Sequence, residues 1–243
     1  MNYEIHGTTM QSLSITLDGA DDLVSEAGCL LYMTPEIELQ TEFLGGVGGV
    51  MKRAFTGNSM TINRYRNRQS SRQTVAFSTR MPGHIIPVEV HPARPVYVQK
   101  HSFLCCESTV NLEVAGYFNL AGIFGGNGIL MTRLEGHGQA FISVDGESLA
   151  KDLSHGESLL VHPAHVAAYE GTVNYEVVRM KGLKNMFFGG DGLALVKLTG
   201  PGRAWLHTLN IRQLATELAE VEDGNSGAVK GGLIGGIIGD LFK

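Results

Sequence analysis

The sequence predicts an all-β protein built from three repeats, and three observations lead to that prediction. First, Phe124 to Ile142 matches Phe188 to Leu206 step for step at a constant offset of 64 (188 minus 124), which is the mark of repeat architecture. Second, glycine makes up 32 of 243 residues, well above its usual share of roughly 7%, as in proteins with many tight turns. Third, short runs such as Leu13 to Leu17 alternate with the period of a half-buried strand.

The internal matches define three repeat units within one β domain that covers 1–206. Val98 to Thr109 matches Val161 to Thr172 at an offset of 63 (161 minus 98), and a fainter first copy places Val24 on Val98. One unit alone would leave an apolar face in water, so we expect all three to share one core. The expected architecture is a β-sandwich or double-stranded β-helix-like domain with pseudo-three-fold symmetry. The units are expected at 1–78, 79–142 and 143–206.

Strands are expected in the same order along each unit. In the first unit, the run that ends at Leu17 meets the turn Asp18-Gly19, and two further strand-like runs lie on either side of Pro35. In the second and third units, the matching runs that begin at Val98 and Val161 each continue into a second alternating run. These continuations are Val110 to Val114 and Val173 to Val177.

After the third unit the pattern changes to a helix followed by a glycine-rich tail. Apolar residues recur at three- and four-residue spacings from Leu206 to Val221, which predicts a helix over 207–223 with one apolar stripe. The apolar tail, 224–243, repeats Gly-x-x-x-Gly, a spacing that allows close packing, but it is too short and too charged to span a bilayer. We expect Gly231 to Phe242 to pack on its own subunit, on a neighbouring subunit or on a membrane surface, and we favour a subunit contact.

Charge and cysteine content limit the compartment and the partners. The formal net charge is −5, which gives no electrostatic reason to expect nucleic acid as a partner. The three cysteines form an odd set without framework spacing, which suits a reducing compartment. The segment Met1 to His6 lacks the pattern of a signal peptide. We therefore expect a cytoplasmic protein.

Four segments in combination carry a family resemblance. They are the Phe-Gly-Gly-x-Gly and Leu-x-Gly-x-Gly motif at 188–202, its copy at 124–138, the segment 57–65, and Pro82 to Pro87. The chain resembles, over nearly its whole length, the conserved uncharacterised family related to the altered-inheritance-of-mitochondria (mitochondrial biogenesis) proteins. The resemblance implies a fold similar to that of the tryptophan RNA-binding attenuation protein, and it supplies no catalytic residues.

The glycine-rich motifs are interpreted as turns rather than as phosphate loops. A strand-like run, not a helix, follows each motif, and no Lys-Ser/Thr pair closes a P-loop. We expect the glycines to supply positive φ angles and close chain approach at turns and bulges. These structural glycines are Gly125, Gly126, Gly128, Gly136, Gly138, Gly189, Gly190, Gly192, Gly200 and Gly202.

A metal-dependent β-helix enzyme that uses His162, His165 and Glu170 is one alternative. Two histidines and a carboxylate suit iron or zinc, but residues three apart in a strand point to opposite faces. The repeat also places Gln99 and Ser102 at the positions of the two histidines, so the scaffold itself requires no ligand there. We expect hydrogen-bonded or surface histidines, with no metal and no cofactor.

An RNA or anionic-lipid binder is a second alternative, through the basic segment from Arg64 to Arg72. Arg64, Arg66 and Arg68 would share one face of a strand, with Arg72 beyond them, and could neutralise phosphates. The favoured interpretation is a solvated hairpin whose arginines pair with acidic side chains.

Adjacent Cys105 and Cys106 would face opposite sides of a strand, which favours buried packing over redox chemistry. No nucleophile elbow and no Ser/His/Asp order are evident. The sequence therefore predicts a non-enzymatic scaffold or binding protein. We expect it to form a homo-oligomer and to engage a membrane-associated or protein partner through Gly231 to Phe242.

Overall fold

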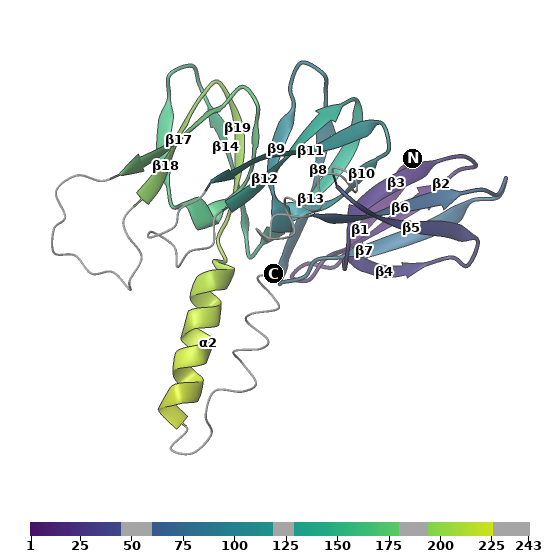
Figure 1. The fold of residues 1–243 in the computed structure, drawn as a ribbon, viewed down its shortest axis with the longest axis horizontal. Coiled ribbons are helices and arrows are strands. Elements are labelled where there is room, and N and C mark those ends of the chain that lie inside the picture. The colour runs from purple at the N-terminus through teal and green to yellow at the C-terminus, as the bar shows by residue number, and fades with distance from the viewer. Residues whose placement is uncertain (45–59, 119–128, 180–193, 226–243) are drawn as a thin grey trace. The chain divides into compact units, whose positions relative to one another are not determined.

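The computed structural model describes residues 1–44, 60–118, 129–179 and 194–225. They divide into a β domain, Met1–Thr208, and a second unit that begins at Leu209. The described strands of the β domain form four antiparallel sheets (Figure 1). The all-β fold class is thus confirmed.

Taken in chain order, the first and the last of the four sheets have fewer strands than the two between them. The first has the order β1-β2-β7-β4, with strands β1 (Asn2–His6), β2 (Ser12–Leu17), β7 (Gln73–Ser78) and β4 (Leu30–Met33). The last has the order β15-β18-β17, with strands β15 (Ser158–Val161), β18 (Ala194–Thr199) and β17 (Asn174–Arg179).

The two middle sheets have six strands each. The first is β5 (Ile37–Phe43), β6 (Thr61–Asn67), β3 (Asp22–Glu26), β10 (Phe103–Glu107), β13 (Gly138–Asp145) and β8 (Gly83–Val90), in that order. The second is β11 (Val110–Phe118), β12 (Ile129–Gly136), β9 (Val96–Gln99), β16 (Val166–Glu170), β19 (Gly202–His207) and β14 (Ser148–Leu153).

Each six-stranded sheet consists of two half-sheets from successive parts of the chain. In the first, β5-β6-β3 joins β10-β13-β8 through the pair β3–β10, and in the second β11-β12-β9 joins β16-β19-β14 through β9–β16. The pairing order therefore recurs along the chain. Three-fold symmetry remains a prediction, because a recurrent pairing order defines no rotation axis. The boundaries of the three units also remain predictions. The boundary expected at 142/143 lies inside β13.

A β-bulge recurs at the same place in three strands. It lies between Leu30 and Tyr32 in β4, between Phe103 and Cys105 in β10, and between Val166 and Ala168 in β16. The ladders also correct one detail of the repeat alignment. Ser25 pairs with Cys105 as Val98 pairs with Ala168, so Ser25 rather than Val24 is the counterpart of Val98.

Hydrophobic clusters fill the space between successive sheets. The first includes Leu13 of β2 and Tyr65 of β6, the second Val24 of β3 and Val98 of β9, and the third residues such as Tyr169 of β16 and Val196 of β18. This alternation of sheet and core is sandwich-like, as expected.

The adjacent cysteines of β10 face opposite cores. Cys105 belongs to the first cluster and Cys106 to the second. Cys29, Cys105 and Cys106 are all free and buried. Burial raises the pKa of the Cys29 thiol to about 11 and raises those of Cys105 and Cys106 as well, so these thiols are poor nucleophiles.

The second unit contains helix α2 (Ile211–Asn225). Its start lies after Asn210, whose side-chain oxygen accepts a hydrogen bond from the Gln213 N–H at 3.3 Å, as a helix N-cap does. The sequence placed this helix at 207–223. No helix in the described part of the chain is long and apolar enough to cross a membrane. The tail segment Gly231 to Phe242 lies outside the described residues.

Candidate functional site

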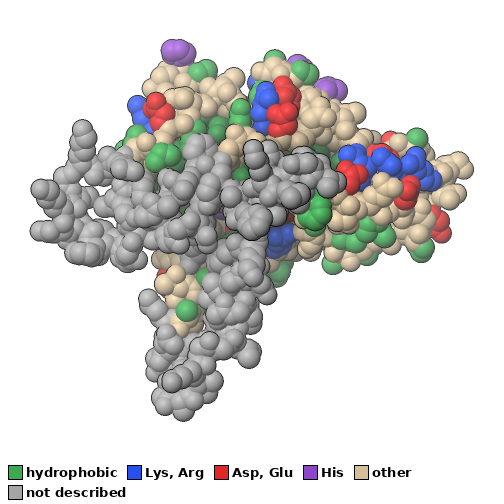
Figure 2. Space-filling model, viewed as in Figure 1, with side chains coloured by type: hydrophobic (Ala, Val, Ile, Leu, Met, Phe, Trp, Pro, Cys, Tyr) green, Lys and Arg blue, Asp and Glu red, His purple; other side chains and the backbone are tan. Residues whose placement is uncertain are grey.

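The arginine segment forms a row of ion pairs beside β5 and β6. Nε of Arg66 lies 3.0 Å from Oδ2 of Asp22, and Nε of Arg64 lies 3.6 Å from Oε1 of Glu42. Beyond the strand, Arg68 pairs with Glu38 and Arg72 with Asp18, each at 2.9 Å. Blue and red side chains lie next to each other over this end of the β domain (Figure 2). All four arginines are thus paired with carboxylates. This is the pairing that the sequence favours over binding to phosphates.

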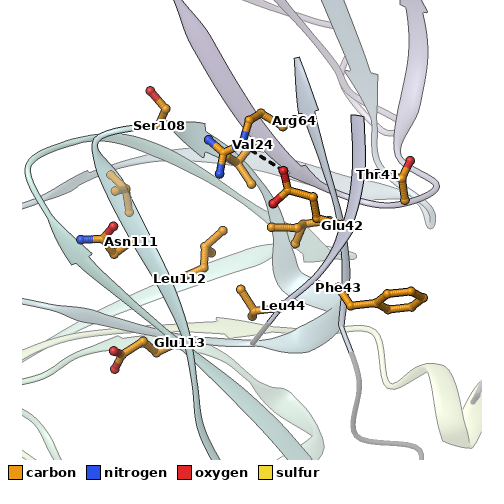
Figure 3. Close-up of a pocket in the computed structure, with 12 residues that line it drawn as sticks. Val24, Thr41, Glu42, Phe43, Leu44, Arg64, Ser108, Asn111, Leu112 and Glu113 are labelled. Carbon is orange, nitrogen blue, oxygen red and sulfur yellow. Dashed lines mark ion pairs between the residues drawn. The ribbon is translucent and has the colours of Figure 1, made fainter. Parts of the chain in front are cut away.

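A groove of about 680 Å³ lies between this row and β11. Its walls come from β5 and β6 on one side and from Val110 to Glu113 on the other. Because side chains alternate along a strand, Glu42 and Leu44 point inward while Phe43 points away (Figure 3). Leu112 points inward from β11 towards Leu44 (Figure 3). Residues about 70 positions apart in sequence therefore meet here.

The groove has a charged end and an apolar end. The Arg64–Glu42 ion pair lies at the charged end, and Leu44 with Leu112 forms the apolar end (Figure 3). Buried Val24, Ile62 and Val110 complete the apolar lining.

Two strands with unpaired edges border this groove. Among the strands that the structure describes, β5 pairs only with β6, and β11 pairs only with β12. The outer N–H and C=O groups of an edge strand are a template for a further strand. Each of the two edges therefore offers backbone groups to which an extended chain can add.

The two candidate histidines lie at a turn, which corrects the expectation that they face opposite sides of a strand. Strand β15 ends at Val161, and Pro163, which cannot donate to a ladder, begins the short 3-10 helix η3 (Pro163–His165). The ring centroids of His162 and His165 are 5.7 Å apart. His162 Nδ1 accepts the Ala164 N–H at 3.3 Å, and His165 Nδ1 donates to the His207 carbonyl at 2.7 Å.

Glu170, the third metal candidate, has a structural role in β16. Its Oε2 accepts the backbone N–H of Arg203 at 2.9 Å, and its Oε1 lies 3.4 Å from Nη1 of Arg94. Glu107 makes the same contact in the preceding segment, where its Oε2 accepts the N–H of Gln139 at 2.8 Å. Within the described ranges no group of three or more His, Cys, Asp or Glu side chains is placed to hold a metal ion.

The motif glycines that the structure describes lie at turns between strands. Gly138 lies beside the carboxylate of Glu107, and Gly202 beside that of Glu170. Gly136, Gly138 and Gly202 have φ angles of +119°, +153° and +138°. A Cβ on Gly138 would lie 2.6 Å from Oε2 of Glu107, and one on Gly200 would collide with the backbone of Leu153 and Ser154. Gly125, Gly126, Gly128, Gly189, Gly190 and Gly192 lie outside the described residues.

Three buried titratable side chains did not emerge from sequence reasoning. Burial raises the pKa of Glu26 to about 7 and that of Asp145 to about 6, although the positive charge of Arg80 acts against both shifts. Burial also lowers the pKa of His207 to about 4. Its Nδ1 lies 3.9 Å from Oδ2 of Asp145, and its Nε2 donates to the Ala164 carbonyl at 2.6 Å. Each is the last residue of its strand, and no sequence motif marks it.

Together, the half-sheets and the groove between two sheet edges define the class of this molecule as an all-β protein. The chain belongs to the mitochondrial biogenesis AIM24 family, whose model matches residues 3–209. This range covers all the described strands but β1's first residue, and it ends just before α2.

Two proteins of Streptococcus pyogenes are similar to this chain. An uncharacterized protein of serotype M6 is 22% identical over 214 residues, which is 85% of this chain and 84% of that protein. The crystal structure of another S. pyogenes protein has a TM-score of 0.74 at 21% identity and covers 90% of this chain and 99% of its own. This likeness supports the fold. Similarity to the tryptophan RNA-binding attenuation protein stays a prediction.

Proposed function

We propose that this protein is a non-enzymatic binding scaffold that self-associates and holds an extended, apolar segment of a partner protein. The groove between β5 and β11 is the observation on which this proposal depends. It combines two edge strands, which can add a strand through backbone hydrogen bonds, with an apolar interior that selects alternate side chains.

Charge favours a protein segment over RNA or a lipid headgroup. Arg64 is paired with Glu42, and Glu113 stands on the opposite wall, so the groove offers no surplus positive charge. Binding to a phosphate backbone depends mainly on Lys and Arg side chains that neutralise the phosphates, and its affinity falls steeply with added salt. A neutral, extended segment instead gains from burial against Leu44 and Leu112.

The contacts of two of the candidate metal ligands support a non-enzymatic role. Glu170 holds the backbone of Arg203, and His165 holds the carbonyl of His207. The metal-dependent enzyme remains an alternative proposal, which elemental analysis of the purified protein tests: a stoichiometric iron or zinc content would favour it.

Selection from a phage-displayed random peptide library tests the groove. The full-length protein is expected to enrich peptides with alternating apolar residues. Leu112→Asp should reduce their capture by about tenfold or more, since loss of a central hot-spot anchor costs about 2 kcal/mol or more and about 1.4 kcal/mol is tenfold. The matched control is Leu149→Asp, because Leu149 lies on β14 away from the groove and is 45% exposed.

The outcomes separate the candidate ligands. Peptide capture that persists in high salt supports the proposal. No enrichment, or equal loss in the two variants, contradicts it. If labelled homopolymeric RNA or phosphatidylglycerol vesicles bind instead and are released by salt, the basic-segment alternative is favoured. Affinity purification of the full chain against a chain truncated at Gly227 tests the proposed contact through Gly231 to Phe242.

A further inference from the structure

The half-sheets inside the β domain join in one specific register. At the first junction, Cys105, Cys106 and Glu107 of β10 lie opposite Ser25, Val24 and Leu23 of β3. At the second junction, Ala168, Tyr169 and Glu170 of β16 lie opposite Val98, Tyr97 and Val96 of β9. Both junctions are antiparallel, and in each the later strand carries the recurrent bulge.

The β domain ends in two half-sheets of the same kind, and neither is joined to another. In its sheet, β4 occupies the place that β10 and β16 occupy in theirs, with the same bulge and the same neighbour order. Strand β15 likewise occupies the place of β3 and β9. Among the described strands, β4 pairs only with β7 and β15 only with β18. They belong to different sheets, so the chain does not join them to each other.

Apolar side chains that are buried at the internal junctions are exposed at these two ends. Leu31, in the bulge of β4, is 53% exposed, whereas Leu104 in the bulge of β10 is 2% exposed. Leu160 of β15 is 54% exposed, whereas its counterpart Val24 in β3 is 2% exposed and its counterpart Tyr97 in β9 is half-buried. Exposed apolar residues that coincide with an unpaired sheet edge mark an interaction surface.

We propose that β4 of one copy pairs with β15 of a second copy of this chain. The pairing is antiparallel and repeats the internal register, so Tyr32 lies opposite Val161, Met33 opposite Leu160 and Thr34 opposite Leu159. The inference rests on the self-association proposed above and specifies its surface. A second copy is the occupant because this chain itself contains both halves of the junction and shows twice how they fit.

The chemistry of both edges is compatible with this pairing. Neither Leu30–Met33 nor Ser158–Val161 contains a charged residue or a proline, the usual devices that block edge-to-edge contact. Tyr32 is larger than its counterparts Cys105 and Ala168, but its hydroxyl lies 3.0 Å from Oγ of Ser14 on β2. Since β7 lies between β4 and β2, the ring leans away from the free edge.

The proposed interface joins two different surfaces, so an open row of copies keeps a free β4 at one end and a free β15 at the other until it closes. Such head-to-tail contacts give a ring when the rotation closes and a filament when it does not. An interface in which β4 meets β4 would instead stop at a dimer.

Disulfide trapping with full-length protein tests the register. Met33→Cys and Leu160→Cys are prepared separately, mixed and exposed to a mild oxidant. Directly opposed residues of an antiparallel pair have Cβ atoms about 4.5–5.5 Å apart, near the reach of a disulfide. We expect cross-linked dimers only in the mixture. The native cysteines are all buried, which limits background, and Leu149→Cys in place of Leu160→Cys is the matched control.

Sedimentation velocity distinguishes failure of the register from failure of self-association. The wild-type protein should form oligomers that Leu160→Lys weakens by about tenfold or more and that Leu149→Lys leaves unchanged. A monomeric wild type at high concentration overturns both the self-association and this inference. Oligomers that give no cross-link between Met33→Cys and Leu160→Cys overturn this inference but not self-association. Cross-linked dimers formed by either cysteine variant alone do the same. Thermal unfolding of Leu160→Lys confirms that the variant is folded.

Discussion

Replacing Glu26 by glutamine is expected to remove a loss of stability that the wild-type protein suffers as pH rises. Glu26 ends β3, is 4% exposed, and lies 3.4 Å from Nη2 of Arg80. Burial raises its pKa from 4.5 to about 7 in spite of that partner. The folded state therefore binds the proton more tightly than the unfolded chain does.

The pKa values define the direction and the pH range of the effect. Below about pH 4.5 the carboxyl is protonated in both states and contributes no pH dependence. Between 4.5 and about 7 the unfolded chain ionises first, so stability falls with rising pH, and above about 7 the effect is complete. At about 1.4 kcal/mol for each pKa unit, the total is about 3 kcal/mol.

Urea unfolding between pH 4.5 and 8 measures this difference. The free energy of unfolding of Glu26→Gln should match that of the wild type near pH 4.5 and exceed it by about 3 kcal/mol at pH 8. Asp145, whose pKa is also raised, is present in both proteins, so most of its own pH dependence cancels in the comparison. Glu4→Gln, at an exposed site, should run parallel to the wild type. A Glu26→Gln curve that also runs parallel would refute the reasoning.

Three further substitutions test the structural roles of named residues by chemical unfolding. Gly138→Ala should cost about 1–3 kcal/mol because of its positive φ and the nearby Glu107 carboxylate, whereas Gly116→Ala, with nothing within 4 Å of an added Cβ, should cost far less. Glu170→Ala should lower the free energy of unfolding by about 1–3 kcal/mol, because the Arg203 N–H loses its acceptor. It should leave the metal content unchanged, and a metal present in the wild type but absent from the variant would contradict this structural role. Asn67→Ala should cost about 2–3 kcal/mol, since this buried amide donates to the carbonyls of Leu17 and Ser71 and accepts the Gln69 N–H; a change below about 0.5 kcal/mol, the usual size at featureless surface positions, would count against it.

Local pattern predicted much of the fold because strand and helix periods are properties of neighbouring residues. The alternation from Leu13 to Leu17 does form β2, and Cys105 and Cys106 do face opposite cores. The histidines show the limit of this reasoning. If the strand continued through Pro163, His162 and His165 would point to opposite faces. Instead the strand ends before the proline, and the two imidazoles come together in a turn.

The site was less predictable than the fold because its parts are distant in the chain. Arg64 was singled out from the sequence, yet its partner Glu42 and the opposite wall at Leu112 come from other strands. Glu26 carries no motif, and only its burial distinguishes it from the exposed glutamates.

The sequence by itself determined that the chain is all-β and that segments of it recur, because composition, period and internal identity can all be read along one dimension. Its motifs in addition carried the resemblance to the family. Only the tertiary structure decided which half-sheets join, which carboxylate holds which backbone N–H, and which two edges are left unpaired. Those features depend on the register between strands that are tens of residues apart. A register of that kind is set by packing in three dimensions, which no local pattern records.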